Sequence, residues 1–126
     1  MPLFEFVTAR LMERRMARFG KGCARAMLLA ALTMKHKHEG VAPTYAWLAR
    51  KALETRPYWS RINETHFLYE KTGQIIEVGD EVSLSDVVQL VVEAEVESIA
   101  SSLPRWRRDE LCVIAWGGAT DYLRQK

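Results

Sequence analysis

Long hydrophobic runs are missing from this sequence of 126 residues. The apolar stretch 26–34 covers nine residues, whereas a membrane-spanning helix needs about 20. Near the N-terminus, Glu5 and Glu13 interrupt the apolar residues, which is not typical of a signal peptide. We therefore expect neither a signal peptide nor a membrane span, and we expect a cytoplasmic location.

Cysteine is also scarce, with only Cys23 and Cys112 in the chain. The two are far apart in sequence and fall on segments that we predict to be buried helices. A disulfide would require their Cα atoms to lie within about 7 Å. We expect two free, buried thiols in a reducing compartment, which excludes the disulfide-rich secreted class.

Motifs for catalysis, metal binding and cofactor binding are lacking as well. His36 and His38 are two residues apart, so on a helix they point to different sides, whereas helical metal pairs are spaced by three or four. His66 has no nucleophile motif beside it. Gly117-Gly118 lacks the Lys-Ser/Thr of a phosphate-binding loop. We expect no metal, no cofactor and no enzymatic activity.

What the sequence does contain is a strong division of charge. The composition is that of an ordinary globular protein, with 48% hydrophobic and 27% charged residues, and the length fits a single domain covering 1–126. Residues 1–62 hold twelve Lys and Arg against four Glu, a net charge of +8, and residues 63–126 have a net charge of −6. A domain with this division of charge is polarised, and the polarity affects which charged partners it attracts.

Hydrophobic periodicity predicts a mainly α-helical domain of five helices around one central apolar helix. The central segment 23–34 is apolar on nearly every side, so it should be wrapped by the other segments. Gly20 and Gly22 should end the helix that precedes it. The predicted helices, with the central one running on to about residue 38, are 3–19, 23–34, 43–54, 84–101 and 105–123.

A small β-hairpin is expected in the middle of the chain, which makes the fold class α+β. Residues 58–73 could form either a helix or part of a hairpin. We prefer a short helix over 58–63, then strands at 66–70 and 74–78 joined by a turn containing Gly73. The order of helices and strands from Cys23 to Val78 is similar to that of a winged helix-turn-helix, by analogy of fold alone. In this interpretation 44–53 is the supporting helix and 58–63 the reading helix.

Two features of the C-terminal half concern its predicted helices: a capping box and a pair of glycines. Ser83 and Asp86 have the spacing of a capping box that opens the fourth helix, whose exposed side is acidic. Gly117-Gly118 lies in the middle of the last helix. Either that helix breaks there, or another backbone approaches it closely.

DNA binding is the first functional hypothesis, because basic residues and aromatics interleave in the positive half of the chain. Side chains of these types contact phosphates, stacked bases and base edges. The C-terminal helices would then form a homodimer, as two-fold operators require. The candidate DNA- or partner-binding residues are Arg14, Arg18, Trp47, Arg50, Lys51, Arg56, Tyr58, Trp59, Arg61 and Asn63.

Protein binding without chemistry is the alternative. A small polarised protein can dock onto a larger complex, as an adaptor or an inhibitor of the kind that phages and plasmids encode. The acidic side of the fourth helix would then be a partner-binding face, consisting of Asp86, Glu93 and Glu97.

Overall fold

The first helix, α1, is continuous over 35 residues from Leu3 to Lys37. The computed structural model describes residues 3–38 and 43–125. The prediction that Gly20 and Gly22 divide this segment into two helices was wrong. Each glycine costs a helix about 1 kcal/mol relative to alanine, but tertiary packing readily outweighs such a preference.

Three further helices and three strands follow in the described part of the chain. The α2 helix begins after Thr44, whose hydroxyl accepts a hydrogen bond from the backbone N–H of Trp47 at 3.1 Å. The predicted capping box of Ser83 and Asp86 opens α3 and is confirmed. The elements are α2 Tyr45–Glu54, β1 Trp59–Arg61, β2 His66–Tyr69, β3 Gln74–Glu77, α3 Leu84–Ile99 and α4 Arg105–Arg124.

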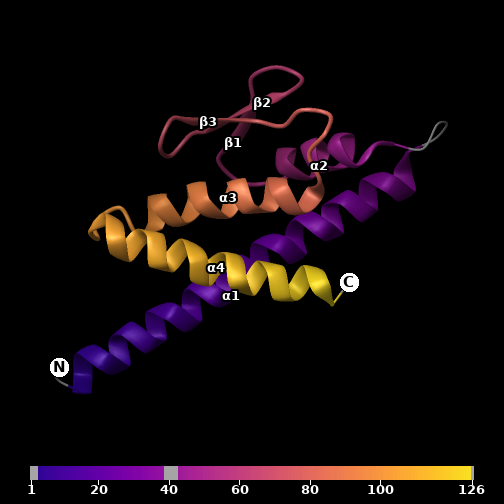
Figure 1. Cartoon of the computed structure of the whole chain (residues 1–126). Helices are drawn as coiled ribbons and strands as arrows, with labels where there is room; N and C mark the ends of the chain where they lie inside the picture. Colours follow the sequence, from indigo (N-terminus) through magenta and orange to yellow (C-terminus); the bar gives the residue numbers. More distant parts are fainter. Residues whose placement is uncertain (1–2, 39–42, 126) are drawn as a thin grey trace.

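The elements are arranged in layers around α3 (Figure 1). The three-stranded sheet lies on one side of α3, and α4 lies on the other side. The long α1 helix crosses α4 diagonally and extends past it at its N-terminal end. The buried apolar side chains of all these layers form one core, which includes Met27, Leu53, Phe67, Val91 and Leu111.

The C-terminal half of α1 is covered on one face only. Ala24 and Met27 are fully buried, but Leu29 and Leu32 are 49% and 42% exposed. The expectation that this segment is wrapped on all sides was therefore wrong. Its apolar composition reflects a buried face toward the core and an additional apolar face toward solvent.

The crossing of α1 and α4 depends on two glycines. A side chain on Gly20 would overlap the carbonyl group of Ala115, and a side chain on Gly118 would overlap that of Ala17. Each helix thus presents a glycine where the other presents a small residue, so the two backbones come close. Of the two alternatives for Gly117-Gly118, the helix does not break, and Gly118 accommodates a close backbone approach.

The segment 58–63 is a strand and a turn, not a helix. β1 pairs antiparallel with β2, with Trp59 opposite Tyr69, and the two rings stack with centroids 4.8 Å apart. Tyr58 has φ +68°, a left-handed backbone conformation that stops a helix and redirects the chain after Pro57. The predicted hairpin of β2 and β3 is present, and Gly73 adopts φ +78° in its turn.

The fold-class prediction therefore needs correction. The described residues form four helices and a three-stranded antiparallel sheet in the order β1-β2-β3. Because 58–63 forms β1 and part of a turn, the helix that would read DNA in a winged helix-turn-helix is absent from that position. Mostly helical structure with a small sheet is the part of the prediction that agrees.

Candidate functional site

Three basic residues of the predicted DNA-binding group are held by carboxylates of the same chain. Arg50 Nη1 donates to Asp80 Oδ1 at 3.1 Å. Glu54 accepts a hydrogen bond from Arg61 Nη1 at 2.5 Å and forms an ion pair with Lys51 Nζ at 3.6 Å. Two carboxylates therefore offset part of the positive charge of these three residues.

The fourth basic residue, Arg56, lies inside the protein. Its Nη2 donates to Glu95 Oε1 at 2.6 Å, and both side chains are mostly buried. Burial raises the pKa of Glu95 above its usual value, and the neighbouring Arg56 offsets part of that rise. The pair connects the turn after α2 with the middle of α3. Glu95 is thus buried, although it lies on the same helix as the exposed Glu93 and Glu97.

The aromatic residues of the predicted DNA-binding group pack mainly against side chains of the same protein. Trp47 is half-buried and packs against the ring of His38, with the centroids 4.9 Å apart. Trp59 is buried against Tyr69. Tyr58 is exposed, and Lys71 Nζ lies 4.4 Å from its ring centroid.

Asn63 shapes the turn between β1 and β2. Its Oδ1 accepts hydrogen bonds from the backbone N–H of Thr65 at 3.0 Å and of His66 at 2.9 Å. An Asn oxygen that accepts from residues two and three positions later stabilises a turn locally. The structure thus gives Asn63 a local partner, as it does for the basic residues of this region.

A different set of basic residues forms an exposed row along α1. The spacing is four, four, three and four, which keeps the residues within about 80° of the helix circumference over a length of about 22 Å. All are exposed. We call this set the α1 cationic row, and it consists of Arg10, Arg14, Arg18, Lys21 and Arg25.

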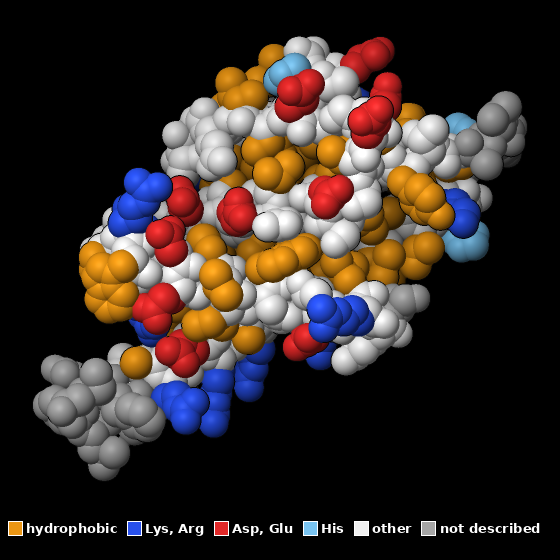
Figure 2. All heavy atoms as spheres, viewed as in Figure 1, with side chains coloured by type: hydrophobic (Ala, Val, Ile, Leu, Met, Phe, Trp, Pro, Cys, Tyr) orange, Lys and Arg blue, Asp and Glu red, His pale blue; other side chains and the backbone are white. Residues whose placement is uncertain are grey.

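Four of the five residues of the α1 cationic row differ from Arg50, Lys51, Arg56 and Arg61 in their ion pairing. Among the described residues, no ion pair involves Arg14, Arg18, Lys21 or Arg25. Figure 2 shows Lys and Arg side chains along the lower edge of the molecule, beneath the N-terminal half of α1. This edge is therefore available to an anionic partner.

The residues predicted from the sequence include Arg14 and Arg18 but not Arg10, on the same predicted helix, nor Lys21 and Arg25 beyond it. A helix break at Gly20 and Gly22 would have separated them. The sequence feature that could have revealed the full row is the three- and four-residue spacing of its cations. That spacing puts the residues on one helix face only if the helix continues through both glycines.

The acidic face predicted on the fourth helix is exposed. Asp86, Glu93 and Glu97 all face solvent on α3. Burial, together with the nearby carboxylates of Glu97, Glu93 and Asp109, raises the pKa of the Cys112 thiol to about 11. These carboxylates therefore lie near the seam between α3 and α4. Acidic side chains predominate over this side of the molecule in Figure 2.

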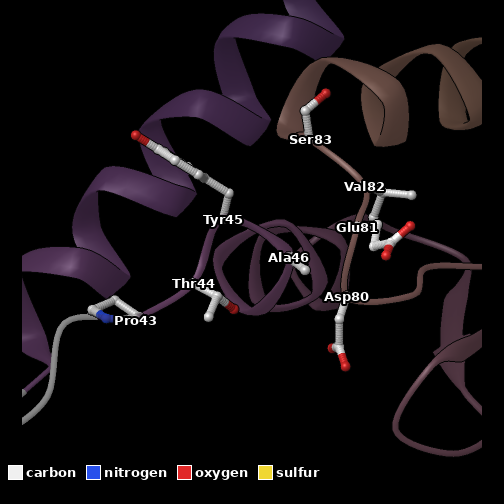
Figure 3. A pocket seen from close by; sticks show the side chains of 8 residues that line it. All are labelled: Pro43, Thr44, Tyr45, Ala46, Asp80, Glu81, Val82 and Ser83. Atoms are coloured by element: carbon white, nitrogen blue, oxygen red, sulfur yellow. The ribbon is translucent and has the colours of Figure 1, made fainter.

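A hollow of about 450 Å³ lies where the N-termini of α2 and α3 meet (Figure 3). Thr44 and Ser83 cap the two helices, and Asp80 and Glu81 border the hollow. Tyr45 and Asp80 point in different directions at its rim. Helix N-termini favour anions, but Asp80 and Glu81 already supply negative charge there, and the Thr44 and Ser83 hydroxyls already accept from a backbone N–H of each helix.

Neither cysteine has the properties of a nucleophile. Both thiols are free, and burial raises the pKa of Cys23 to about 12. The thiolate is the reactive form, so at neutral pH Cys23 and Cys112 are protonated. Within residues 3–38 and 43–125, no group of three or more His, Cys, Asp or Glu side chains is arranged to hold a metal ion.

Comparisons with known proteins do not identify this chain. No protein-family model, no characterised protein and no solved structure matches it significantly. In the part of the chain that the structure describes, no helix has both the length and the apolar character needed to cross a membrane.

Proposed function

We propose that the protein binds duplex DNA without catalysis, through the α1 cationic row. The observation that carries the proposal is the row itself, in which Arg10, Arg14, Arg18, Lys21 and Arg25 are aligned and exposed. Lys and Arg that neutralise phosphates release bound counterions, which favours association. A row of about 22 Å is as long as roughly six base-pair rises of 3.4 Å along the duplex axis.

The contacts are with the DNA backbone and not with base edges. Arg and Lys on phosphates position a protein but carry little sequence information, so binding is largely independent of sequence. The acidic residues Asp86, Glu93 and Glu97 are repelled by phosphates. This repulsion favours an orientation in which α1 faces the duplex.

Fluorescence anisotropy with a labelled duplex tests this function. We expect the double variant Arg14→Ala, Arg18→Ala to bind more weakly. We also expect its slope of log K against log salt, between about 50 and 200 mM, to fall in magnitude by about 2. The matched control is Lys71→Ala, Arg105→Ala, which removes the same charge from other elements and should keep the wild-type slope.

Two outcomes would contradict the proposal. One is an equal loss of affinity in the variant and in the matched control, since the attraction would then depend on net charge alone. The other is displacement of the duplex by polyglutamate at an equal concentration of charge, since the row would then fit an acidic polypeptide as well as it fits DNA.

A further inference from the structure

Exposed leucines lie near both ends of the α1 cationic row. Leu11 is 48% exposed, and Leu29 and Leu32 are 49% and 42% exposed. We call these three residues the α1 leucines. A helix turns by about 100° per residue, so the α1 leucines and the last four cations of the row fall within about 80° of its circumference. From Leu11 to Leu32 this exposed face of α1 is about 32 Å long.

The α1 leucines lie on the side of the helix that points away from the core. The opposite side of α1 contains Met16, Ala24 and Met27, which are at most 8% exposed. Leu11 also borders a hollow of about 420 Å³ together with Ile99 of α3, which is itself 53% exposed. Burial of these leucines therefore requires a surface outside the isolated fold.

The charge around the α1 leucines is mainly positive. Residues 14–38 contain seven Lys and Arg and no Asp or Glu, and Glu39 lies outside the described residues. In the last turn of α1, Lys35 and Lys37 are exposed. Asp121 of α4 borders a hollow beside two cations of the row and offsets part of their charge. Even with this carboxylate, cations outnumber acidic groups along the exposed face of α1.

The combination of leucines and cations on one face limits the kind of partner that fits. A duplex neutralises the cations, but its outer surface of phosphates and sugars gives the α1 leucines no apolar contact. A second copy packed antiparallel by the same face would bring cations against cations, which opposes association. An anionic bilayer has phosphates at its surface and hydrocarbon just beneath them, so both kinds of side chain find a partner.

We infer that α1 also binds the surface of an anionic phospholipid bilayer, with its exposed face toward the lipid. Clusters of about four to eight Lys and Arg on an amphipathic helix are typical of segments that bind acidic phospholipids. The cations of the row contact lipid phosphates, and the α1 leucines enter the boundary between headgroups and acyl chains. This inference does not rest on DNA binding, because only the bilayer uses the leucines.

Co-sedimentation of the whole protein with lipid vesicles at physiological salt tests the inference. We expect binding to vesicles of equal parts phosphatidylserine and phosphatidylcholine, and little binding to phosphatidylcholine alone. The variant Leu29→Gln, Leu32→Gln should bind the anionic vesicles about tenfold more weakly or worse, because it loses apolar contact with the lipid. The matched control Ile62→Gln, Val113→Gln removes exposed apolar side chains from other elements and should bind as the wild type does.

Two further measurements separate this inference from a loss of folding and from DNA binding. Thermal unfolding by circular dichroism reports the fold, which Leu29→Gln, Leu32→Gln should keep because glutamine favours a helix nearly as well as leucine does. In fluorescence anisotropy the same variant should bind duplex DNA as the wild type does. Vesicle binding without duplex binding would contradict the proposed function alone, and the reverse would contradict this inference alone.

Four results would overturn the inference. One is no binding of the wild type to the anionic vesicles, and another is equal binding by the folded Leu29→Gln, Leu32→Gln variant. A third is a dimer of the free protein in sedimentation that this variant abolishes, in which case a second copy covers the leucines. The fourth is tighter binding, in isothermal titration calorimetry, to a helical peptide of Leu and Glu than to the vesicles, in which case the partner is an acidic protein.

Discussion

Neighbouring glycines in this protein have different roles. Gly20 and Gly118 lie at the crossing of α1 and α4, where a side chain would overlap a backbone carbonyl group. Gly22 and Gly117 each face open space. The sequence Gly-Lys-Gly or Gly-Gly does not reveal which glycine is required, because the requirement comes from the other helix.

Alanine substitutions at Gly117 and Gly118 should change stability in opposite directions. Gly117→Ala should raise the free energy of unfolding by up to about 1 kcal/mol, because alanine favours a helix and nothing opposes its methyl group. Gly118→Ala should lower it by about 1–3 kcal/mol through overpacking against Ala17. Urea unfolding measures both, and changes of the same sign would contradict the described crossing.

The buried thiol of Cys23 should make stability depend on pH at the alkaline side. Burial raises its pKa from the ordinary 9.0 to about 12, so the folded state keeps a proton that the unfolded state loses. The contribution of the protonated Cys23 thiol to the free energy of unfolding is fully present below pH 9. It is lost as the pH rises toward 12. The loss is at most about 1.4 kcal/mol per pH unit.

Urea unfolding of the wild type and of Cys23→Ala at neutral and alkaline pH measures this contribution. The stability advantage of the wild type should shrink as the pH rises above 9. Tyrosine and lysine groups titrate in both proteins, so their effects cancel in the comparison. A constant difference across this range would show that Cys23 ionises equally in the folded and unfolded states.

Among the elements, the turn after α2 is joined to α3 by the buried ion pair of Arg56 and Glu95. Removing one partner leaves the other charge buried without compensation. We expect Arg56→Ala to lower the free energy of unfolding by about 3–5 kcal/mol, and the apolar double variant Arg56→Met, Glu95→Leu to lose much less.

A double-mutant cycle with Arg56→Ala, Glu95→Ala and their combination measures the coupling in this pair. Independent effects of the two substitutions would argue against the ion pair. The Arg56→Met, Glu95→Leu protein should still bind duplex DNA, because Arg56 lies in the core and outside the α1 cationic row.

Elements whose boundaries have local causes could be predicted from the sequence. The capping box of Ser83 with Asp86 opens α3, and Gly73 turns the chain between β2 and β3. The continuity of α1 could not be predicted, since it depends on packing against α4 some 95 positions further along the chain. The burial of Glu95 depends in the same way on Arg56, 39 positions away.

The candidate DNA-binding surface was predicted only in part. Counting charges correctly located the positive half of the chain, and Arg14 and Arg18 are in the α1 cationic row. Composition could not show which cations have carboxylate partners. Arg50 and Arg61 have them because folding brings Asp80 and Glu54 close, whereas Lys51 pairs with Glu54 three residues later on the same helix.

For the molecule as a whole, the separation of charge should produce a single orientation on DNA. Lys21 belongs to the α1 cationic row, whereas Lys71 lies in the turn between β2 and β3, in the layer beyond α3 (Figure 1). Acetylation followed by mass spectrometry should show that a bound duplex protects Lys21 and leaves Lys71 reactive. Equal protection of the two lysines would mean that the protein binds in many orientations.

The unbroken α1 helix also limits how this gene can change in length. Deleting one residue between Lys21 and Cys23 would rotate everything before it by about 100° relative to everything after it. The arginines before the deletion would swing off the line of Arg25, and Gly20 would leave the crossing. Point substitutions at exposed positions of α1 should therefore be far better tolerated than single-codon insertions or deletions.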